Sequence, residues 1–421
     1  MYQNHLDLFL KRREGGGMTQ LKGPLDGVKV VSCSTAQAGT VPYMLMADLG
    51  ADVVKIEIPG IGDNSRSQGM VAGHPSSYFE TNNRGVKSLT LNLKDPRGQK
   101  ILHQLVAKAD IFGQNFRPGA AEKNGFGYDE LIKINPKLVY ASVSGYGPDG
   151  PNSELPGTDA MGQALGGIAE AFSSSEGPLR TGIVSVADET CAILTFGGIL
   201  AALHSAQMTG VGQKVETSLL GGQIRLMGWT LTNTMWRENN PVTGQARIAG
   251  TSQRPSMSVN FVDKYQKPFV FQLNGKSWQR AMTALGFYQK LESLGLGDLG
   301  VVVDSDELRK TMLTTLDELF NEDVRDRWID ILRGADIVAA PINTLLEASN
   351  DSDVLANNYI TMVDYPEYGK TVKVHGSPWK FSETPVHIGI APKLGADSEA
   401  LLRGLGYSER QVTLLREDGV V

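Results

Sequence analysis

Short apolar segments alternate with helical ones from residue 27 to residue 147, and this alternation constrains the fold more than any other feature. Segments rich in Val and Ile, typical of buried strands, lie at 27–33, 51–59, 86–93, 111–116 and 138–147. Segments with helical periodicity lie between them, near 40–49 and at 96–109. Strands separated by helices form a largely parallel sheet with helices on both faces. The alternation therefore predicts an α/β domain.

The pattern changes after about residue 225. Residues 237–258 are polar and rich in Gly, Pro and Ser, which predicts a long loop. A strand at 267–274 and helices at 276–294 and 306–320 then indicate a smaller α+β domain. We therefore predict a division into an N-terminal extension at 1–20, a large domain from 21–225, a small domain from 226–333, and a return to the large domain at 334–421.

Composition excludes several classes of function. The formal net charge of -6 argues against nucleic acid as the main partner. Two cysteines cannot build a disulfide framework, and the six histidines show no HExxH spacing, so we expect no metal site. No run of about 20 uninterrupted apolar residues indicates a membrane span. The first 17 residues lack the features of a secretory signal, so we expect a cytoplasmic protein.

The first strand-to-helix turn, Ser34–Gly39, decides whether the parallel sheet binds a dinucleotide. The turn contains neither GxGxxG nor GxxxxGK[ST], which argues against phosphate binding of the NAD or ATP type. No GxSxG motif is present, and neither cysteine lies in the context of a protease or thiolase.

Asp188 directly precedes a long apolar helical segment and has two interpretations. It can be a purely structural N-cap, which is the commoner role for Asp at such a position. It can also be a nucleophile, because the helix terminus favours its ionised form at neutral pH and the nearby N–H groups can hold an oxyanion. Asp159 begins another helical segment and has the same two interpretations. Local sequence does not choose between them.

Other residues are ambiguous when taken singly. Basic side chains near the predicted strand ends can meet phosphates or lie on the solvated surface; they are Arg84, Lys87, Lys94, Arg117 and Lys123. Trp229 and Trp236 lie seven residues apart, which predicts packing on one helix face.

Several segments taken in order resemble the class III CoA-transferase family, over almost the whole chain from Pro24 to Val412. They are PLDGVKVV, AQAG with GADVVKIE, GDNSR, KSLTLNLKDPRG, NFRPGAAEKNGFGYDEL, NPKLVYASVSGYGPDGP, PGTDAMGQALGG, VADETCAIL and GQKVETSLL. The resemblance implies a large Rossmann-like domain built from both chain ends, a smaller inserted domain, and two subunits interlocked as a dimer.

The resemblance also implies a mechanism and a site. The aspartyl nucleophile of the family falls on Asp188, which would form an anhydride and then a thioester with coenzyme A. Asp159 matches an acidic position near that nucleophile. No tightly bound cofactor is implied, since CoA thioesters are the substrates. Contacts with coenzyme A carry over to Gln37, Ala38, Arg66, Leu91, Lys94, Asn115, Phe116 and Lys123.

The chain departs from the formyl-CoA transferase pattern in several places. Ile58 stands where an Arg is expected, Lys123 replaces an Arg, and the run of glycines that covers that site is missing; GQARIAG at 244–250 is a possible substitute. A 2-methylacyl-CoA racemase is an alternative, but racemases have a His where this chain has Thr158. A subunit of a heteromeric transferase, such as one acting on benzylsuccinate, is another. Succinyl-CoA is the expected donor, with a carboxylic acid as acceptor.

Overall fold

The computed structural model describes residues 23–172, 184–240, 248–251 and 253–421. They form two compact units, one built from both ends of the chain and including Ala356–Val421, the other mainly from 237–355. The predicted extension at 1–20 and most of GQARIAG lie outside the described residues.

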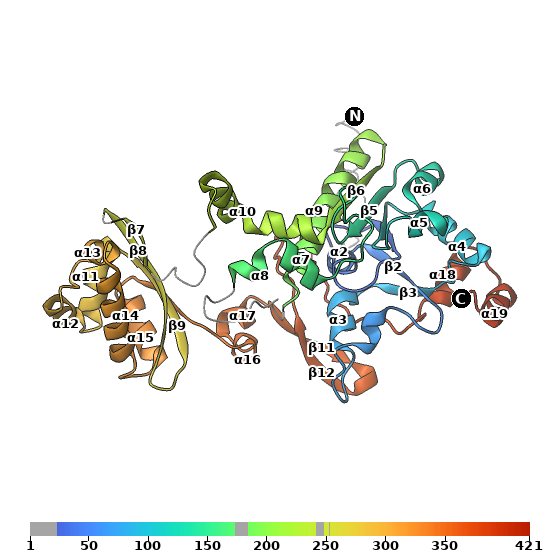
Figure 1. Ribbon diagram of the computed structural model, residues 1–421. Helices are drawn as coiled ribbons and strands as arrows, with labels where there is room; N and C mark the ends of the chain where they lie inside the picture. The colour runs from blue at the N-terminus through green and yellow to red at the C-terminus, as the bar shows by residue number, and fades with distance from the viewer. Residues whose placement is uncertain (1–22, 173–183, 241–247, 252) are drawn as a thin grey trace. The chain divides into compact units, whose positions relative to one another are not determined.

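The larger unit is built on a six-stranded sheet in the order β3-β2-β1-β4-β5-β6, with every neighbouring pair parallel (Figure 1). The strands are β1 (Lys29–Ser32), β2 (Asp52–Glu57), β3 (Lys87–Thr90), β4 (Ile111–Gln114), β5 (Val139–Ser144) and β6 (Gln213–Ser218). This confirms the prediction of a parallel sheet. The strand order is that of the Rossmann fold, whose topological switch point lies between β1 and β4.

Helices connect these strands and cover the sheet. They are α2 (Val41–Asp48), η1 (Asn64–Ser67), α3 (Ser77–Asn83), α4 (Pro96–Val106), α5 (Ala120–Lys123), α6 (Tyr128–Ile134), α7 (Asp159–Leu165), α8 (Ile168–Ala171), α9 (Val186–Thr209) and α10 (Leu219–Arg237). The first five predicted strands and the helices near 40–49 and 96–109 all correspond to observed elements.

Each face of the sheet has its own hydrophobic core. Adjacent residues of one strand point to opposite faces, so Ile111 joins one core and Phe112 the other. The first core packs against α2 and α9, and the second against α4, α6 and the two C-terminal helices, α18 (Ser398–Gly404) and α19 (Glu409–Glu417). The carboxyl edge of the sheet is therefore held between two packed layers.

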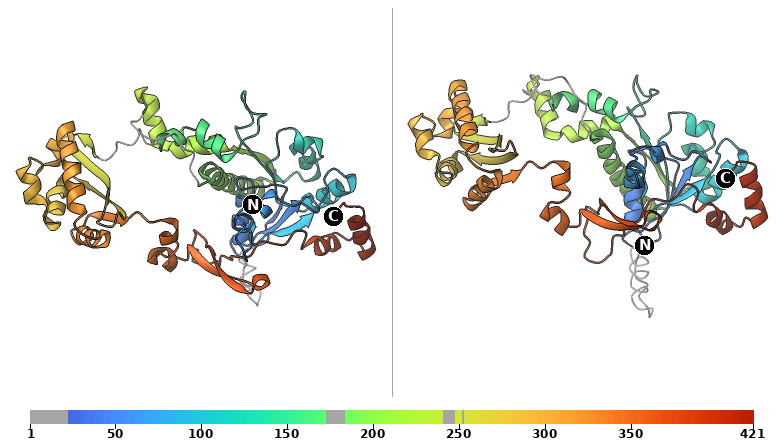
Figure 2. Two further views of the ribbon diagram at one scale, coloured as in Figure 1. Left: turned by 60° about the horizontal axis from the view of Figure 1, so that its bottom comes forward. Right: turned by 90° about the horizontal axis from the view of Figure 1, so that it is seen from below.

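The last part of the chain returns to the larger unit. After α17 (Ser352–Ala356) it forms a hairpin of β11 (Ile360–Tyr365) and β12 (Lys370–His375) joined by η2 (Pro366–Tyr368). It then reaches β3, where the Asp397 carboxylate accepts the Ser88 N–H at 2.9 Å and the Ser398 hydroxyl accepts the Thr90 N–H at 3.2 Å. Figure 2 shows the red C-terminal helices beside the cyan and blue part of the unit.

The smaller unit has a four-stranded antiparallel sheet in the order β10-β9-β8-β7 and one hydrophobic core. Its elements are β7 (Ile248–Thr251), β8 (Arg254–Val262), β9 (Pro268–Asn274), α11 (Gly275–Ala284), α12 (Tyr288–Ser293), α13 (Leu299–Val303), α14 (Asp306–Phe320), α15 (Arg325–Gly334), β10 (Val338–Pro341) and α16 (Leu345–Ala348). The helix predicted at 276–294 is two helices, separated at Gly286, which has a φ of +78°.

Two predictions about this region differ from the structure. The long loop predicted at 237–258 is wrong for its last part, because β7 and most of β8 lie there. Met257, Val259 and Phe261 are buried at alternate positions, while polar residues occupy the positions between them. The return predicted at 334 comes later, because β10 pairs with β9 inside the smaller unit.

Helix α9 is 24 residues long and, by length and composition alone, is apolar enough to cross a membrane. A buried core helix meets the same criterion. Phe196, Ile199 and Leu203 of α9 are buried in the core shared with α2 and the sheet, which accounts for its composition.

Candidate active site

The N-terminus of α9 places Asp188 at the carboxyl edge of the sheet. A helix that leads into a parallel strand must begin at the edge where the strands end, and α9 leads into β6. Asp188 is the third residue of α9, and the N-cap position is Ser185, which makes no side-chain capping bond. The interpretation of Asp188 as the N-cap is therefore wrong, since the helix begins at Val186, two residues earlier.

The carboxylate of Asp159, the first residue of α7, caps α9 instead. Asp159 Oδ1 accepts the N–H of Ala187 at 2.8 Å and the N–H of Asp188 at 3.1 Å. Its Oδ2 accepts Gln163 Nε2 at 2.5 Å. The two acidic residues that the sequence singled out are thus joined directly, backbone to side chain.

This contact changes the expected source of oxyanion donors. The N–H groups of Ala187 and Asp188 point at Asp159, and the Glu189 N–H donates to Ser185 O at 2.9 Å. The expectation that the first turn of α9 offers free N–H groups is therefore wrong. An oxyanion near Asp188 therefore needs donors other than these three N–H groups.

The Asp188 carboxyl has an unusual acidity. Burial, followed by the negative charges of Asp159 and Glu189, raises its pKa to about 7. The direction of this pKa shift is opposite to the one expected from the helix terminus alone. Burial also raises the pKa of Cys191, one turn further along α9, to about 11, so this thiol stays protonated.

The turn after β1 meets the loop after β4 at the topological switch point of the sheet. The Asn115 side chain accepts the Thr35 N–H at 2.9 Å and donates to the Thr35 carbonyl at 2.8 Å. Gln37 Nε2 donates to Glu189 Oε1 at 2.6 Å, and Ala38 packs against Ala187 and Cys191. The structure therefore brings Gln37, Ala38 and Asn115 to the N-terminus of α9.

The other predicted contacts of coenzyme A lie along the same edge of the sheet. Leu91 follows β3 and is buried, and Phe116 follows β4 with 37% of its surface exposed. Lys94 and Lys123 are exposed. Parallel sheets bind ligands outside the carboxyl ends of their strands. Contact of these residues with coenzyme A stays a prediction.

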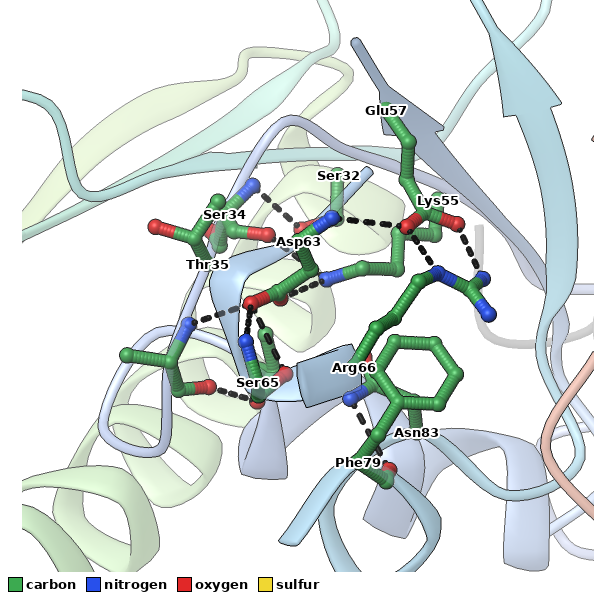
Figure 3. Close-up of polar contacts among 12 residues, drawn as sticks. Ser32, Ser34, Thr35, Lys55, Glu57, Asp63, Ser65, Arg66, Phe79 and Asn83 are labelled. Carbon is green, nitrogen blue, oxygen red and sulfur yellow. Dashed lines mark hydrogen bonds and ion pairs between the residues drawn. The ribbon is translucent and has the colours of Figure 1, made fainter. Parts of the chain in front are cut away.

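Arg66 has partners within the chain (Figure 3). Its guanidinium donates to both Glu57 carboxylate oxygens, at 2.8 and 2.6 Å, and to the Pro392 carbonyl at 3.0 Å. It also lies 3.8 Å from the centre of the Phe79 ring. Each nitrogen of Arg66 thus has an acceptor in the fold, and its contact with coenzyme A stays a prediction.

Two other basic candidates form ion pairs far from the carboxyl edge of the sheet. Arg84 is buried and pairs with Asp48 at 2.6 Å, at the end of α2. Because α2 runs back from the carboxyl edge, this pair lies at the opposite edge of the sheet. Lys87 pairs with Asp52 at 2.6 Å at the start of β2. Neither is placed to meet a ligand at the switch point.

Sequence reasoning missed two residues near Asp188. Glu189 follows Asp188 directly and binds Gln37, but an adjacent acidic residue in a helical segment carries no signal of its own. Tyr78, on α3, has its pKa raised to about 12 by burial and by the negative charges of Asp188 and Asp63, so its hydroxyl stays protonated and can donate. No pattern around Tyr78 indicated this position.

Comparison with known proteins identifies close counterparts. Residues 25–398 match the family described as CoA-transferase family III. The chain is 32% identical to the acetyl-CoA:oxalate CoA-transferase of Acetobacter aceti, covering 92% of this chain and 97% of that one. It is 29% identical to the human succinyl-CoA:glutarate CoA-transferase, covering 97% and 92%. It is 31% identical to a formyl-CoA:oxalate CoA-transferase of Streptomyces avermitilis, covering 94% and 99%.

Solved structures show the same fold. The chain superimposes on a CAIB/BAIF family protein from Brucella suis with a TM-score of 0.80 and 26% identity, covering 91% of this chain and all of that one. A protein from Mycobacterium tuberculosis, at 23% identity, gives a TM-score of 0.74 over 91% of this chain.

Proposed function

This chain belongs to CoA-transferase family III and is a transferase enzyme, and we propose that it moves coenzyme A between carboxylic acids with Asp188 as its covalent nucleophile. The observation that carries the proposal is the position of Asp188, in the first turn of α9 at the carboxyl edge of the sheet. Asp159 accepts its backbone N–H, and Gln37 binds the neighbouring Glu189.

The reaction follows from an aspartate that attacks thioesters. The Asp188 carboxylate adds to the carbonyl of the donor acyl-CoA, and CoA thiolate leaves, giving a mixed anhydride. The thiolate then attacks the aspartyl carbonyl and releases the donor acid as its carboxylate. The acceptor carboxylate attacks the resulting aspartyl-CoA thioester, and the thiolate released attacks the acceptor's carbonyl. Asp188 is regenerated and no proton is consumed.

Side chains supply the donors for the oxyanions of these steps. The Tyr78 hydroxyl remains protonated beside the acidic residues, and the Gln37 amide carries a second N–H besides the one bound to Glu189. Donors aimed at developing negative charge stabilise such intermediates. This assignment replaces the first-turn amides of α9, which Asp159 occupies.

A panel of acids tests the proposed activity. Purified protein is given acetyl-CoA, succinyl-CoA or formyl-CoA with oxalate, glutarate or benzylsuccinate, and the thioesters formed are identified by mass. The oxalate and glutarate names of the relatives motivate two of these acceptors. We expect a new thioester with at least one pair, with succinyl-CoA as the first candidate donor. No new thioester with any pair would contradict the proposal.

The charge beside the nucleophile sets its pH dependence. Glu189 is among the groups that raise the pKa of Asp188, and the ionised form of Asp188 is the reactive one, so kcat/KM rises with pH through about 7. A Glu189→Gln variant keeps an acceptor for Gln37 but removes the charge. The rise of kcat/KM with pH therefore begins at lower pH in this variant, so the acidic limb of its pH profile is shifted. Its kcat/KM at pH 6, divided by its kcat/KM at pH 8, should exceed the wild-type ratio by about twofold or more.

Profiles of kcat/KM between pH 5 and 9 measure this shift. Glu409→Gln is the matched control, because Glu409 lies in the first turn of α19 and is exposed. Its profile should overlay that of the wild type. An unmoved acidic limb in Glu189→Gln would show that another group controls the limb.

A racemase of the same superfamily is less well supported. Racemisation requires a base on each side of the α-carbon. Thr158, which precedes Asp159 and is the N-cap residue of α7, has a neutral hydroxyl that cannot serve as the second base. Incubation of a chiral 2-methylacyl-CoA in deuterium oxide separates the two activities, because a racemase incorporates deuterium at the α-carbon.

We also propose that the chain acts as a dimer in the cytoplasm, either with a second copy or with a paralogous subunit. Trp229 and Trp236 are 79% and 83% exposed, so the packing predicted for them within the chain is absent. Both lie on α10, and other exposed apolar residues lie on α10 and on helices α7 and α9: Ile224, Leu226, Met161, Leu165, Ile193 and Leu194. Such surfaces are typical of subunit interfaces. Light scattering should give about twice the chain mass of 45.4 kDa, and a monomer would contradict the proposal.

A further inference from the structure

One buried ion pair and one partly buried ion pair lie next to the Ser34–Ala36 turn that precedes Gln37 (Figure 3). Lys55 Nζ lies 2.7 Å from Asp63 Oδ2, with 3% and 0% of these side chains exposed. Glu57 pairs with Arg66, and its Oε2 also accepts the Asp63 N–H at 3.0 Å. Lys55 and Glu57 are two apart on β2 and so lie on one face of the sheet. Segments GADVVKIE and GDNSR thus contribute to one network.

The first of these pairs is attached to the backbone of the turn. Lys55 Nζ donates to the Ser34 carbonyl at 2.8 Å. Asp63 Oδ1 accepts the Ala36 N–H at 3.4 Å, as well as the Ser65 N–H and hydroxyl at 2.9 and 2.8 Å. Burial works to raise the pKa of Asp63, but Lys55 and the Ser65 donors outweigh it and lower the pKa, so the carboxylate stays charged.

The turn needs such support because of its conformation. Ala36 has a φ of +59°, in the left-handed region that residues other than Gly adopt rarely. Strained conformations persist only where the surroundings over-determine them. Here the Ser34 carbonyl is held from β2, the Thr35 backbone by Asn115, the Ala36 N–H by Asp63, and the Ala36 carbonyl by the Thr40 hydroxyl.

We propose that Lys55 and Asp63 are positioning residues for the transfer reaction, which hold the Ser34–Ala36 turn so that Gln37 reaches Glu189 beside the nucleophile. The inference rests on the proposed function of Asp188. Neither residue contacts the reacting atoms. They act through the backbone to which Gln37 is attached, and a displacement of about 1 Å at such a group costs about 100-fold in rate.

Lys55→Met tests this proposal, with Arg84→Met as the matched control. Both variants remove the cation of a buried pair, but Arg84 pairs with Asp48 at the opposite edge and binds the carbonyls of His375 and Gly376. We expect faster amide hydrogen exchange at residues 34–37 in Lys55→Met only. With the donor and acceptor that the wild type turns over fastest, kcat should fall roughly 10- to 100-fold, with the KM for the acid changed less than about twofold.

Arg84→Met should lose about as much thermal stability as Lys55→Met does, but its kcat should stay within about twofold of the wild-type value. If Lys55→Met does not fold, Lys55→Met/Asp63→Asn removes both charges and keeps an acceptor for Ala36, and the same results are expected. If amide exchange at residues 34–37 is unchanged in Lys55→Met, the ion pair does not hold the turn. If exchange is faster but kcat is unchanged, the turn does not position Gln37 for the reaction. A wild-type protein without transfer activity would overturn the proposed function instead. The exchange data would still show whether Lys55 and Asp63 hold the Ser34–Ala36 turn.

Discussion

An Asp188→Asn variant loses CoA transfer by about 10³-fold or more while the fold is retained. The carboxamide cannot form the anhydride or the thioester, and the buried Cys191 thiol stays protonated, which makes it a poor substitute nucleophile. Initial rates measure the loss. Peptide mapping after hydroxylamine treatment should show modification at Asp188 in the wild type and none in the variant.

The same variant has a characteristic stability. The pKa of Asp188 is raised above its ordinary value of 3.8 to about 7, so the folded chain holds a proton that the unfolded chain releases. Stability therefore falls as pH rises from about 4 to about 7. Asn cannot ionise, so the melting temperature of Asp188→Asn should equal or exceed that of the wild type above pH 7.

Asp129→Asn is the control for this variant, because Asp129 lies exposed in the first turn of α6. It should retain full activity. A folded Asp188→Asn protein that transfers coenzyme A within tenfold of the wild-type rate would contradict the covalent mechanism.

An Asp159→Ala variant loses about 100-fold in kcat. Its carboxylate holds the backbone N–H groups of Ala187 and Asp188, and without it the backbone that carries the nucleophile is no longer fixed. The variant also lacks one of the charges that raise the pKa of Asp188, so the acidic limb of kcat/KM moves to lower pH. Steady-state kinetics between pH 5 and 9 measure both effects.

A purely structural role for Asp159 would change stability alone. Asp298 provides the comparison, since its carboxylate accepts the Gly300 N–H at 2.8 Å and caps α13 in the smaller unit. Asp298→Ala should cost about 1 kcal/mol of stability and leave the pH profile unchanged. If Asp159→Ala likewise kept its kcat and its acidic limb, Asp159 would be only a helix cap.

Much of the fold could be predicted from local patterns. Alternating apolar and helical segments indicate a parallel sheet because each strand is buried on both faces, as Ile111 and Phe112 are. The sequence also placed Asp188 next to a long helical segment, but strand β6, which puts that end of the helix at the carboxyl edge, was not predicted. These features depend on residues close together in the chain.

Features set by distant side chains could not be predicted. Asp159 caps a helix that begins 27 residues later, so the start of α9 could not be located from α9 itself. The pKa of Asp188 depends on which carboxylates the fold brings near it. Strand β8 lies in a segment of polar composition and forms by pairing with β9. Arg66 could not be distinguished from a ligand contact until its bonds to Glu57 and Pro392 were known.

The hydrogen bonds from the C-terminal segment to β3 bear on how the chain folds during synthesis. Ser398 bonds Thr90, which is 308 positions earlier, and the Val420 carbonyl accepts the Asn92 N–H at 2.8 Å. The ribosome therefore releases the smaller unit, a local antiparallel structure, before the larger one can be completed. Contacts of such long range slow folding and leave apolar strands uncovered in the interim. We therefore expect β3 to lack its C-terminal hydrogen-bond partners until the last residues of the chain have been synthesised.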